Sequence, residues 1–185
     1  MRQSAAQRYG NIGEDWALAE FQARGHEARL ISNYFDQFDI LIDGVLPVEV
    51  KLSRSYLRKV RPGYYAPTWC FDTARIAKGQ DYLLLLICED QYKQFWPYLV
   101  PSFFVGDRQT IGITSHPRKY KGYWADSLSR WSVIEWLINI RQHYNQQLPL
   151  LGTGDNSTKT HEWGQNTTGI AIPLAVSPFP IGVSA

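Results

Sequence analysis

The chain has 185 residues, 44% of them hydrophobic, which supports one packed domain plus an extension and excludes disorder throughout. The formal net charge of +2 excludes a global basic field, so any electrostatic case for a nucleic-acid partner must rest on local clusters. Two cysteines and four histidines show neither a disulfide framework nor zinc-ligand spacing, and no apolar run is long enough to span a bilayer.

The first predicted element is a helix. Ser4 followed by Gln7 forms a capping box at its start, and Gly25 supplies a stop. Two stripes follow helical spacing, and their members are Ile12, Trp16, Ala19 and Ala23 in one and Glu14, Ala17, Leu18 and Phe21 in the other. Glu14 therefore lies in line with apolar residues rather than on a clearly solvated face.

A β-hairpin is predicted next. The segments FDILID (38–43) and VLPVEVKL (45–52) are rich in β-formers and flank Asp43-Gly44, a strong turn dipeptide. Pro47 lacks a backbone N–H, so it needs a position that spares the ladder, such as an edge or a bulge.

The remaining elements are predicted from shorter signals. Residues 53–60 favour a short helix that Arg61-Pro62-Gly63 breaks, and a loop rich in Tyr and Trp follows. Residues 82–88 are typical of a buried central strand. Further strands are expected over 95–101 and 110–114, and an amphipathic helix over 127–146.

This order of elements predicts an α/β fold, with a small mixed β-sheet flanked by helices. The predicted domain covers residues 1–148. From residue 149 to 185 the composition shifts to Gly, Thr, Asn, Ser and Pro without a sustained apolar period. We interpret that segment as a linker or peripheral extension.

One cluster of residues predicts chemistry. Glu49 and Lys51 are two apart in a predicted strand, so both side chains project to one face. Asp39 begins the preceding strand and can approach that face across the hairpin. Two carboxylates beside a lysine form an oxygen site for a hard cation such as Mg²⁺, which would polarise a phosphoryl oxygen and activate a bound water. Lys51 can orient that water or stabilise charge on the phosphate.

Each of these residues also has a simpler explanation. Glu-apolar-Lys is the ordinary pattern on the solvated face of an amphipathic strand. Asp39 alone is typical of a strand end, and Glu14 alone of a solvated helix position. The combination, rather than any single residue, favours a catalytic site.

The combination resembles the PD-(D/E)XK nuclease superfamily, which has a restriction-endonuclease-like core. The matching segments are Gly10-Asn11-Ile12-Gly13-Glu14 with Ala17, then Phe38-Asp39-Ile40, then Val48-Glu49-Val50-Lys51. Within the superfamily, residues 8–52 resemble archaeal Holliday-junction resolvases and intron-encoded endonucleases, and residues 82–138 follow a similar layout more loosely. Phe38 stands where the family usually has proline.

The resemblance implies roles for these residues. Asp39 and Glu49 would ligate Mg²⁺, or Mn²⁺ in its place, with help from the Val50 carbonyl. Lys51 would assist the attacking water, and Glu14 would bind the metal directly or through water. The product would carry a 5′-phosphate.

Two basic, aromatic segments are candidate DNA contacts. Between Glu49 and Asp72 the chain has no acidic residue, and a second acid-free stretch follows Arg108. A phosphate backbone that reaches the site would meet such residues next, although charged runs are more often simply solvated. The residues predicted to contact DNA are Arg54, Arg58, Lys59, Arg61, Tyr64, Tyr65, Arg118, Lys119 and Lys121.

The leading prediction is a cytoplasmic, Mg²⁺-dependent DNA endonuclease, sequence-specific in the manner of homing or restriction enzymes. The alternatives are a structure-specific junction resolvase and a non-catalytic DNA-binding or assembly subunit. A homodimer or higher homo-oligomer is expected because two DNA strands must be cut. Membership of a larger defence or mobile-element complex is a further alternative, and no membrane partner is expected.

Overall fold

The structure is a computed structural model that describes residues 4–31, 38–74 and 82–147. The predicted extension, 149–185, lies outside the described residues. No helix in the described ranges is long and apolar enough to cross a membrane. Cys88 is buried and Cys70 is exposed, and both are free thiols, as the lack of a cysteine framework predicts.

Helix α1 (Ala5–Ala23) confirms the first prediction. Gln7 N donates to Ser4 Oγ at 3.2 Å, and Ser4 N donates to Gln7 Oε1 at 2.8 Å, so both halves of the capping box form. The helix buries Gly13 together with Ala17 and Phe21, which belong to the stripe that contains Glu14. In the other stripe Ile12 remains 47% exposed, whereas Trp16 packs against the core.

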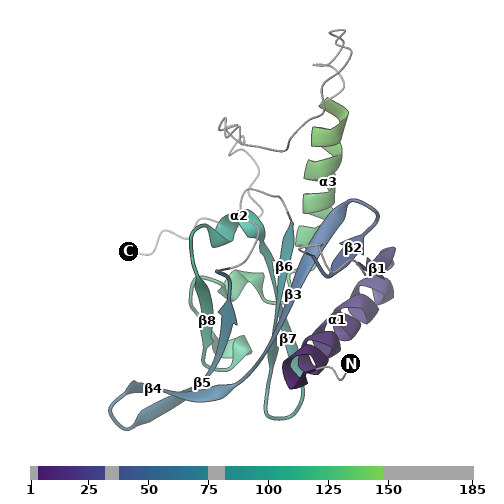
Figure 1. The fold of residues 1–185 in the computed structure, drawn as a ribbon. Coiled ribbons are helices and arrows are strands. Elements are labelled where there is room, and N and C mark those ends of the chain that lie inside the picture. Colours follow the sequence, from purple (N-terminus) through teal and green to yellow (C-terminus); the bar gives the residue numbers. More distant parts are fainter. Residues whose placement is uncertain (1–3, 32–37, 75–81, 148–185) are drawn as a thin grey trace, which may run out of the picture.

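A five-stranded mixed sheet has the order β1-β2-β3-β6-β7. Its strands are β1 (Ala28–Leu30), β2 (Ile40–Ile42), β3 (Leu46–Arg54), β6 (Leu83–Glu89) and β7 (Phe95–Pro101). Only β3 and β6 run parallel, and all seven residues of β6 are buried, which confirms the predicted central strand. The predicted mixed α/β architecture is therefore present (Figure 1).

The predicted hairpin joins β2 to β3. Asp43 and Gly44 adopt positive φ angles of 50° and 68°, as a tight hairpin turn requires. The missing N–H of Pro47 removes no hydrogen bond to β6, because β3 begins to pair with β6 only at Val48.

The predicted helix over 53–60 and the loop after it are wrong. Residues 56–61 form β4 (Tyr56–Arg61), and β5 (Tyr64–Asp72) returns beside it after a turn at Gly63, where φ is 74°. Together with β8 (Thr110–Thr114), these strands make a second sheet of order β4-β5-β8. All six residues of β4 are exposed, so the strand carries no alternating burial pattern that a sequence could display.

The β4–β5 hairpin, which we call the ribbon, projects beyond the body of the molecule (Figure 1). Its first strand continues β3 after a break at Ser55. The ribbon is thus an extension of the strand that carries Glu49 and Lys51.

The C-terminal part of the described chain contains two α-helices and two 3-10 turns. They are α2 (Ser102–Val105), the 3-10 turns η1 (Pro117–Lys119) and η2 (Ala125–Ser127), and α3 (Ser132–Gln147). The helix predicted over 127–146 begins at Ser132 because Ser129 takes φ of 52° and donates its N–H to Pro97 O at 2.8 Å. Helix α2 was not predicted.

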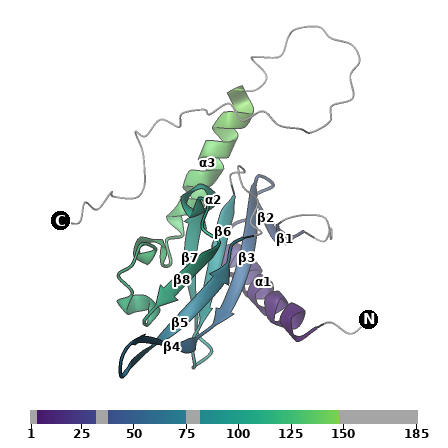
Figure 2. The same ribbon diagram turned by 60° about the vertical axis from the view of Figure 1, so that its left-hand side comes forward.

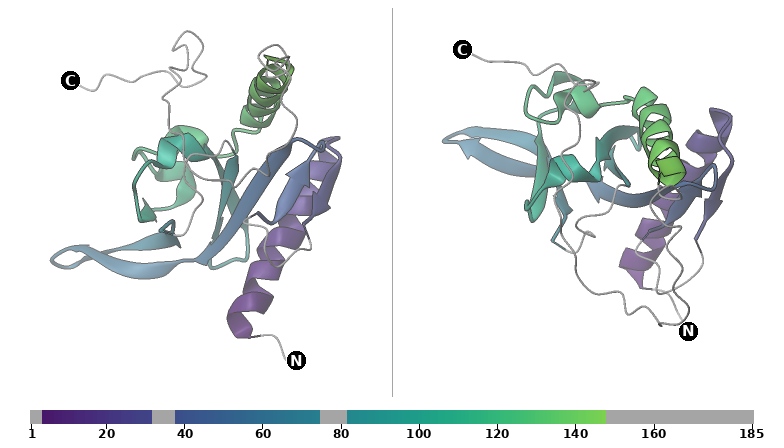
Figure 3. Two further views of the ribbon diagram at one scale, coloured as in Figure 1. Left: turned by 45° about the horizontal axis from the view of Figure 1, so that its top comes forward. Right: turned by 90° about the horizontal axis from the view of Figure 1, so that it is seen from above.

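The five-stranded sheet has a hydrophobic core on each face. One core packs α1 and α3 against residues such as Ile40, Val48 and Leu85, and the other packs β5 and β8 against residues such as Leu84 and Leu86. Figure 3 shows α1 and the second sheet on opposite sides of the main sheet, and Figure 2 shows the second sheet in front of it. Alternation along β3 and β6 therefore assigns each side chain to one of two layers.

Candidate active site

The hairpin brings Asp39 beside Glu49. Asp39 N donates to Val48 O at 2.9 Å, and the following residue, Ile40, pairs with Val48, so Asp39 lies just before the ladder and beside β3. The Asp39 Oδ2 atom also accepts a hydrogen bond from Val50 N at 2.7 Å. The backbone of the hairpin thus holds the Asp39 carboxylate at the edge of β3.

Glu49 and Lys51 share a face of β3, as strand periodicity predicts. Lys51 Nζ lies 2.8 Å from Glu49 Oε1, and the Lys51 and Glu49 side chains are 27% and 19% exposed, respectively. The intervening Val50 and the neighbouring Leu52 pack against the core on the opposite face. The ion pair therefore lies in a partly desolvated position, where its charges are less screened than on an open surface.

The electrostatics of Asp39 indicate an excess of negative charge. Burial, followed by the charge of Glu49, raises the pKa of Asp39 to about 7, although the Val50 N–H opposes the shift. Glu14 raises the pKa further, and Lys51 lowers it slightly. One lysine thus does not balance the carboxylates that converge here, and an added cation would relieve their repulsion.

Glu14 reaches this site from α1. An added Cβ on Gly13 would lie only 2.9 Å from Leu52 Cβ, so the helix is in close contact with β3 at that point. β2 pairs with β3 from Leu46 to Val48, so Glu49 and Lys51 lie beyond that pairing. Burial raises the pKa of Glu14, and the charges of Asp15 and Glu49 add to the shift.

The donor set suits a hard cation held partly by its substrate. Among the residues that the structure describes, no three Asp, Glu, His or Cys side chains are grouped closely enough to hold a metal alone. Asp39 and Glu49 provide two carboxylates. Mg²⁺ commonly binds through one or two carboxylates, with waters and substrate phosphates completing its shell, so the residues fit such an ion.

A main-chain oxygen lies at the same edge. The N–H and C=O of one strand residue point to the same side of the strand. Because Val50 N–H donates to Asp39, the Val50 carbonyl also faces the Asp39 edge, away from β6. A Val50 carbonyl with this orientation would be available as the third oxygen ligand that the family resemblance implies.

The predicted DNA contacts fall into two groups. Those on the ribbon are all exposed, namely Arg58, Lys59, Arg61, Tyr64 and Tyr65. Arg118, Lys119 and Lys121 are exposed near η1, and Ser115 N bonds Pro67 O at 2.8 Å, so this segment starts at the base of the ribbon. The second group therefore follows directly after β8, the strand that pairs with β5.

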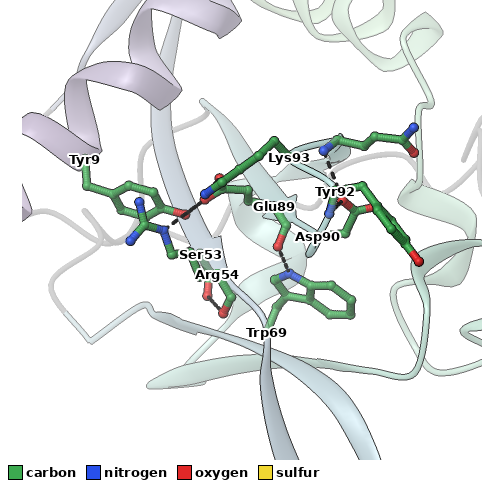
Figure 4. Close-up of polar contacts among 9 residues, drawn as sticks. Tyr9, Ser53, Arg54, Trp69, Glu89, Asp90, Tyr92 and Lys93 are labelled. Atoms are coloured by element: carbon green, nitrogen blue, oxygen red, sulfur yellow. Dashed lines mark hydrogen bonds and ion pairs between the residues drawn. The ribbon is translucent and has the colours of Figure 1, made fainter.

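Arg54 differs from the other predicted contacts. Its Nε lies 3.1 Å from Glu89 Oε2, and its guanidinium stacks 4.1 Å from the centre of the Tyr9 ring (Figure 4). Glu89 also accepts from Tyr9 at 2.5 Å and from Lys93 at 2.7 Å. Arg54 thus helps to join α1, β3 and β6, in addition to any contact with a ligand.

Sequence reasoning missed two buried polar residues at opposite ends of β6. Glu89 was not singled out, and Tyr82 was only the first residue of an apolar run. Tyr82 is fully buried, and its hydroxyl has no hydrogen-bond partner within the described residues. No local pattern distinguishes either residue, because their neighbours come from distant segments.

Comparisons with known proteins bear on the fold. No protein-family model matches the sequence, and no curated protein matches it. A bacterial homing endonuclease, I-Ssp6803I, superposes with a TM-score of 0.52 over 78% of this chain and 99% of that chain. The chain has a nuclease-type fold. The two sequences are only 15% identical, so the roles of individual residues rest on the geometry described above.

Proposed function

We propose that this protein is a divalent-metal-dependent DNA endonuclease that hydrolyses phosphodiester bonds, with Mg²⁺ as its ion and Mn²⁺ as a substitute. The observation that supports it best is the convergence of Asp39, Glu49 and Lys51 at the edge of β3 in a nuclease-type fold.

Each residue of the site would have its own chemical role. A bound divalent cation would polarise the scissile phosphate and lower the pKa of a coordinated water. Asp39, Glu49 and the Val50 carbonyl would hold that cation, and Glu14 would bind it directly or through a water. The ammonium of Lys51, held beside Glu49, would orient the attacking water or stabilise the charge that develops on the phosphate.

The ribbon supports duplex DNA as the substrate. A two-stranded β-ribbon fits the major groove, where each base pair presents a distinct pattern of donors and acceptors. Arg58 and Arg61 can bind phosphates or guanines, and Tyr64 and Tyr65 add aromatic surface. This arrangement favours sequence-specific cleavage of the homing or restriction type.

The spacing of site and ribbon is compatible with one continuous DNA contact. Tyr56, the first residue of β4, lies five positions after Lys51, a span of about 17 Å, or about five base pairs of B-DNA. We therefore expect the recognised bases to begin about five base pairs from the cut. Cleavage of both strands would require two copies of the site, hence a homodimer or higher homo-oligomer.

The test is a cleavage assay with three substrates. Supercoiled plasmid, linear duplex and a four-way junction are each incubated with Mg²⁺ and with EDTA, using the wild type, Asp39→Ala and Lys51→Ala. We expect Mg²⁺-dependent cutting of duplex DNA, reduced about 100-fold or more in either variant.

Other outcomes are equally informative. Binding to DNA without metal-dependent cutting would favour a non-catalytic DNA-binding subunit. Cutting that survives both substitutions would refute the site, and cutting of the junction alone would replace sequence specificity with a resolvase activity.

A further inference from the structure

The backbone and the ring of Tyr82 are fixed by contacts, whereas its hydroxyl is not. Its backbone N–H donates to Ser102 Oγ at 3.2 Å, and its carbonyl accepts from Ser102 N at 3.0 Å. Its ring packs against Phe38, with 4.9 Å between the ring centres. The hydroxyl is buried without a hydrogen bond to any described residue, an arrangement that costs about 1–3 kcal/mol. Such a group is retained most readily where a second state supplies its partner.

Tyr82 lies on the sheet face that carries the proposed metal site. Leu84, two residues beyond Tyr82, is the ladder partner of Glu49, so alternation places Tyr82 on the face that carries Glu49 and Lys51. Phe38, which stacks on Tyr82, directly precedes Asp39. Burial first, and then the charge of Glu49, raises the pKa of Tyr82 to about 12, in agreement with this proximity.

The chemistry of the surroundings limits what the hydroxyl can bind. Because Tyr82 is 0% exposed, a DNA phosphate cannot touch it, and its partner must come from inside the site. Lys51 Nζ donates a hydrogen bond to Glu49 Oε1, and no described residue donates one to Glu49 Oε2. A phenol is a good donor to a carboxylate, and a ligand carboxylate bonded in this way is held in one orientation.

We propose that Tyr82 is a positioning residue of the metal site, whose hydroxyl donates to Glu49 Oε2, directly or through one buried water, when a divalent cation binds. This inference rests on the proposed function, because it assigns Glu49 as a metal ligand. The structure itself shows Lys51 Nζ bonded to Glu49 Oε1 and the Tyr82 hydroxyl without a partner among the described residues.

Tyr82→Phe tests the proposal, and Tyr98→Phe is its matched control. Tyr98, on β7, is also 0% exposed and lies in the same core cluster as Tyr82, but its hydroxyl donates to Pro117 O at 3.4 Å. Mn²⁺ affinity is measured from the EPR signal of free Mn²⁺, with and without a duplex oligonucleotide. Melting temperature without metal and cleavage as a function of Mg²⁺ concentration complete the set.

Tyr82→Phe and Tyr98→Phe are expected to differ both in Mn²⁺ affinity and in metal-free melting temperature. Tyr82→Phe should bind Mn²⁺ about 10-fold more weakly and need correspondingly more Mg²⁺ for cleavage, with a metal-free melting temperature equal to or above that of the wild type. Tyr98→Phe should melt at a lower temperature and bind Mn²⁺ like the wild type.

Each remaining outcome decides the matter. Unchanged Mn²⁺ affinity in Tyr82→Phe, in a wild type that cuts DNA, would overturn the role of Tyr82 and leave the proposed function intact. A loss of metal-free stability equal to that of Tyr98→Phe would show that the hydroxyl is already bonded, and would also overturn it. Weaker Mn²⁺ binding in a protein that cuts no DNA would support the positioning role and refute the nuclease. A wild type that neither binds Mn²⁺ nor cuts DNA would refute both.

Discussion

Asp39 carries the largest electrostatic cost in the described site. Its pKa lies near 7 instead of the ordinary 3.8, because burial and the Glu49 charge both disfavour the ionised form. A carboxyl whose pKa is raised by folding stabilises the metal-free protein below about pH 4, and this contribution is lost as the pH rises through about 7. The carboxylates of the site therefore repel one another at neutral pH, and the cation that we propose would relieve this repulsion, a common trade of stability for function.

Asp39→Asn is expected to stabilise the metal-free protein while abolishing cleavage. The amide oxygen can still accept from Val50 N–H, and the repulsion with Glu49 disappears. The gain should be about 1–3 kcal/mol at pH 8 and close to zero near pH 4. Chemical denaturation at both pH values measures it, and equal gains at the two values would contradict the assigned pKa.

Glu14 and Asp15 offer a second comparison between single residues. Glu14 feels the charge of Glu49, whereas Asp15 is its exposed neighbour on α1. Glu14→Gln should reduce Mg²⁺-dependent cleavage about 10-fold or more, and Asp15→Asn should leave it within about twofold. Equal effects of the two substitutions in a plasmid-nicking time course would remove Glu14 from the site.

At the scale of secondary-structure elements, the contact between α1 and β3 places Glu14. Gly13 allows that contact, because any larger residue would meet Leu52 at 2.9 Å. Gly10, one turn earlier, has space: an added Cβ would meet only Glu14 Oε1 at 3.8 Å. Packing therefore requires glycine at position 13 of this helix but not at position 10.

Gly13→Ala is expected to destabilise the protein by about 1–2 kcal/mol and reduce cleavage, since overpacking outweighs the better helix propensity of alanine. Gly10→Ala should instead stabilise it by about 0.5–1 kcal/mol. Thermal unfolding of the two variants in parallel checks both signs, and a stabilised Gly13→Ala would refute the tight contact.

The ribbon is the element proposed to bind DNA. Removing Arg58 and Arg61 together should weaken DNA binding and reduce the slope of log K against log salt by about 2, because each phosphate contact contributes about 0.9. Arg29→Ala, on the edge strand β1, serves as the control for the loss of one exposed charge. Fluorescence anisotropy across a salt series gives the slopes, and an unchanged slope in the double variant would exclude phosphate contacts by the ribbon.

At the scale of the whole molecule, Glu89 joins the layers. Burial alone would raise the pKa of Glu89, but hydrogen bonds from Lys93, Tyr9 and Arg54 outweigh it and lower the pKa. Trp69 Nε1 donates to the Glu89 carbonyl at 2.8 Å, which adds β5 to the same junction (Figure 4). Helix, central strands and second sheet therefore meet at one residue.

Glu89→Gln should cost about 2 kcal/mol of unfolding free energy, since three charge-assisted or short hydrogen bonds weaken at once in a buried position. Lys93→Ala removes only the partner that is 70% exposed and should cost at most about 1 kcal/mol. Urea denaturation compares the two, and similar costs would show that Glu89 is held mainly by one surface pair.

Local signals determined the centre of the candidate site. The strand period alone places Glu49 and Lys51 on one face, and the Asp43-Gly44 turn brings Asp39 to them, because both relationships span few residues. The central strand over 82–88 was also evident, since its apolar run is buried on both faces. The first helix was predictable from its capping box for the same reason.

Only the tertiary structure decided the rest. Strand β4 was predicted as a helix because an exposed strand owes its conformation to the partner it pairs with, and β5 follows after the turn at Gly63. Tyr82, Glu89 and the close contact at Gly13 depend on segments tens of residues away, so no sequence period records them. Sequence determined which residues share a strand face, whereas the packing of separate elements decided which faces meet, because burial is a property of the assembled layers.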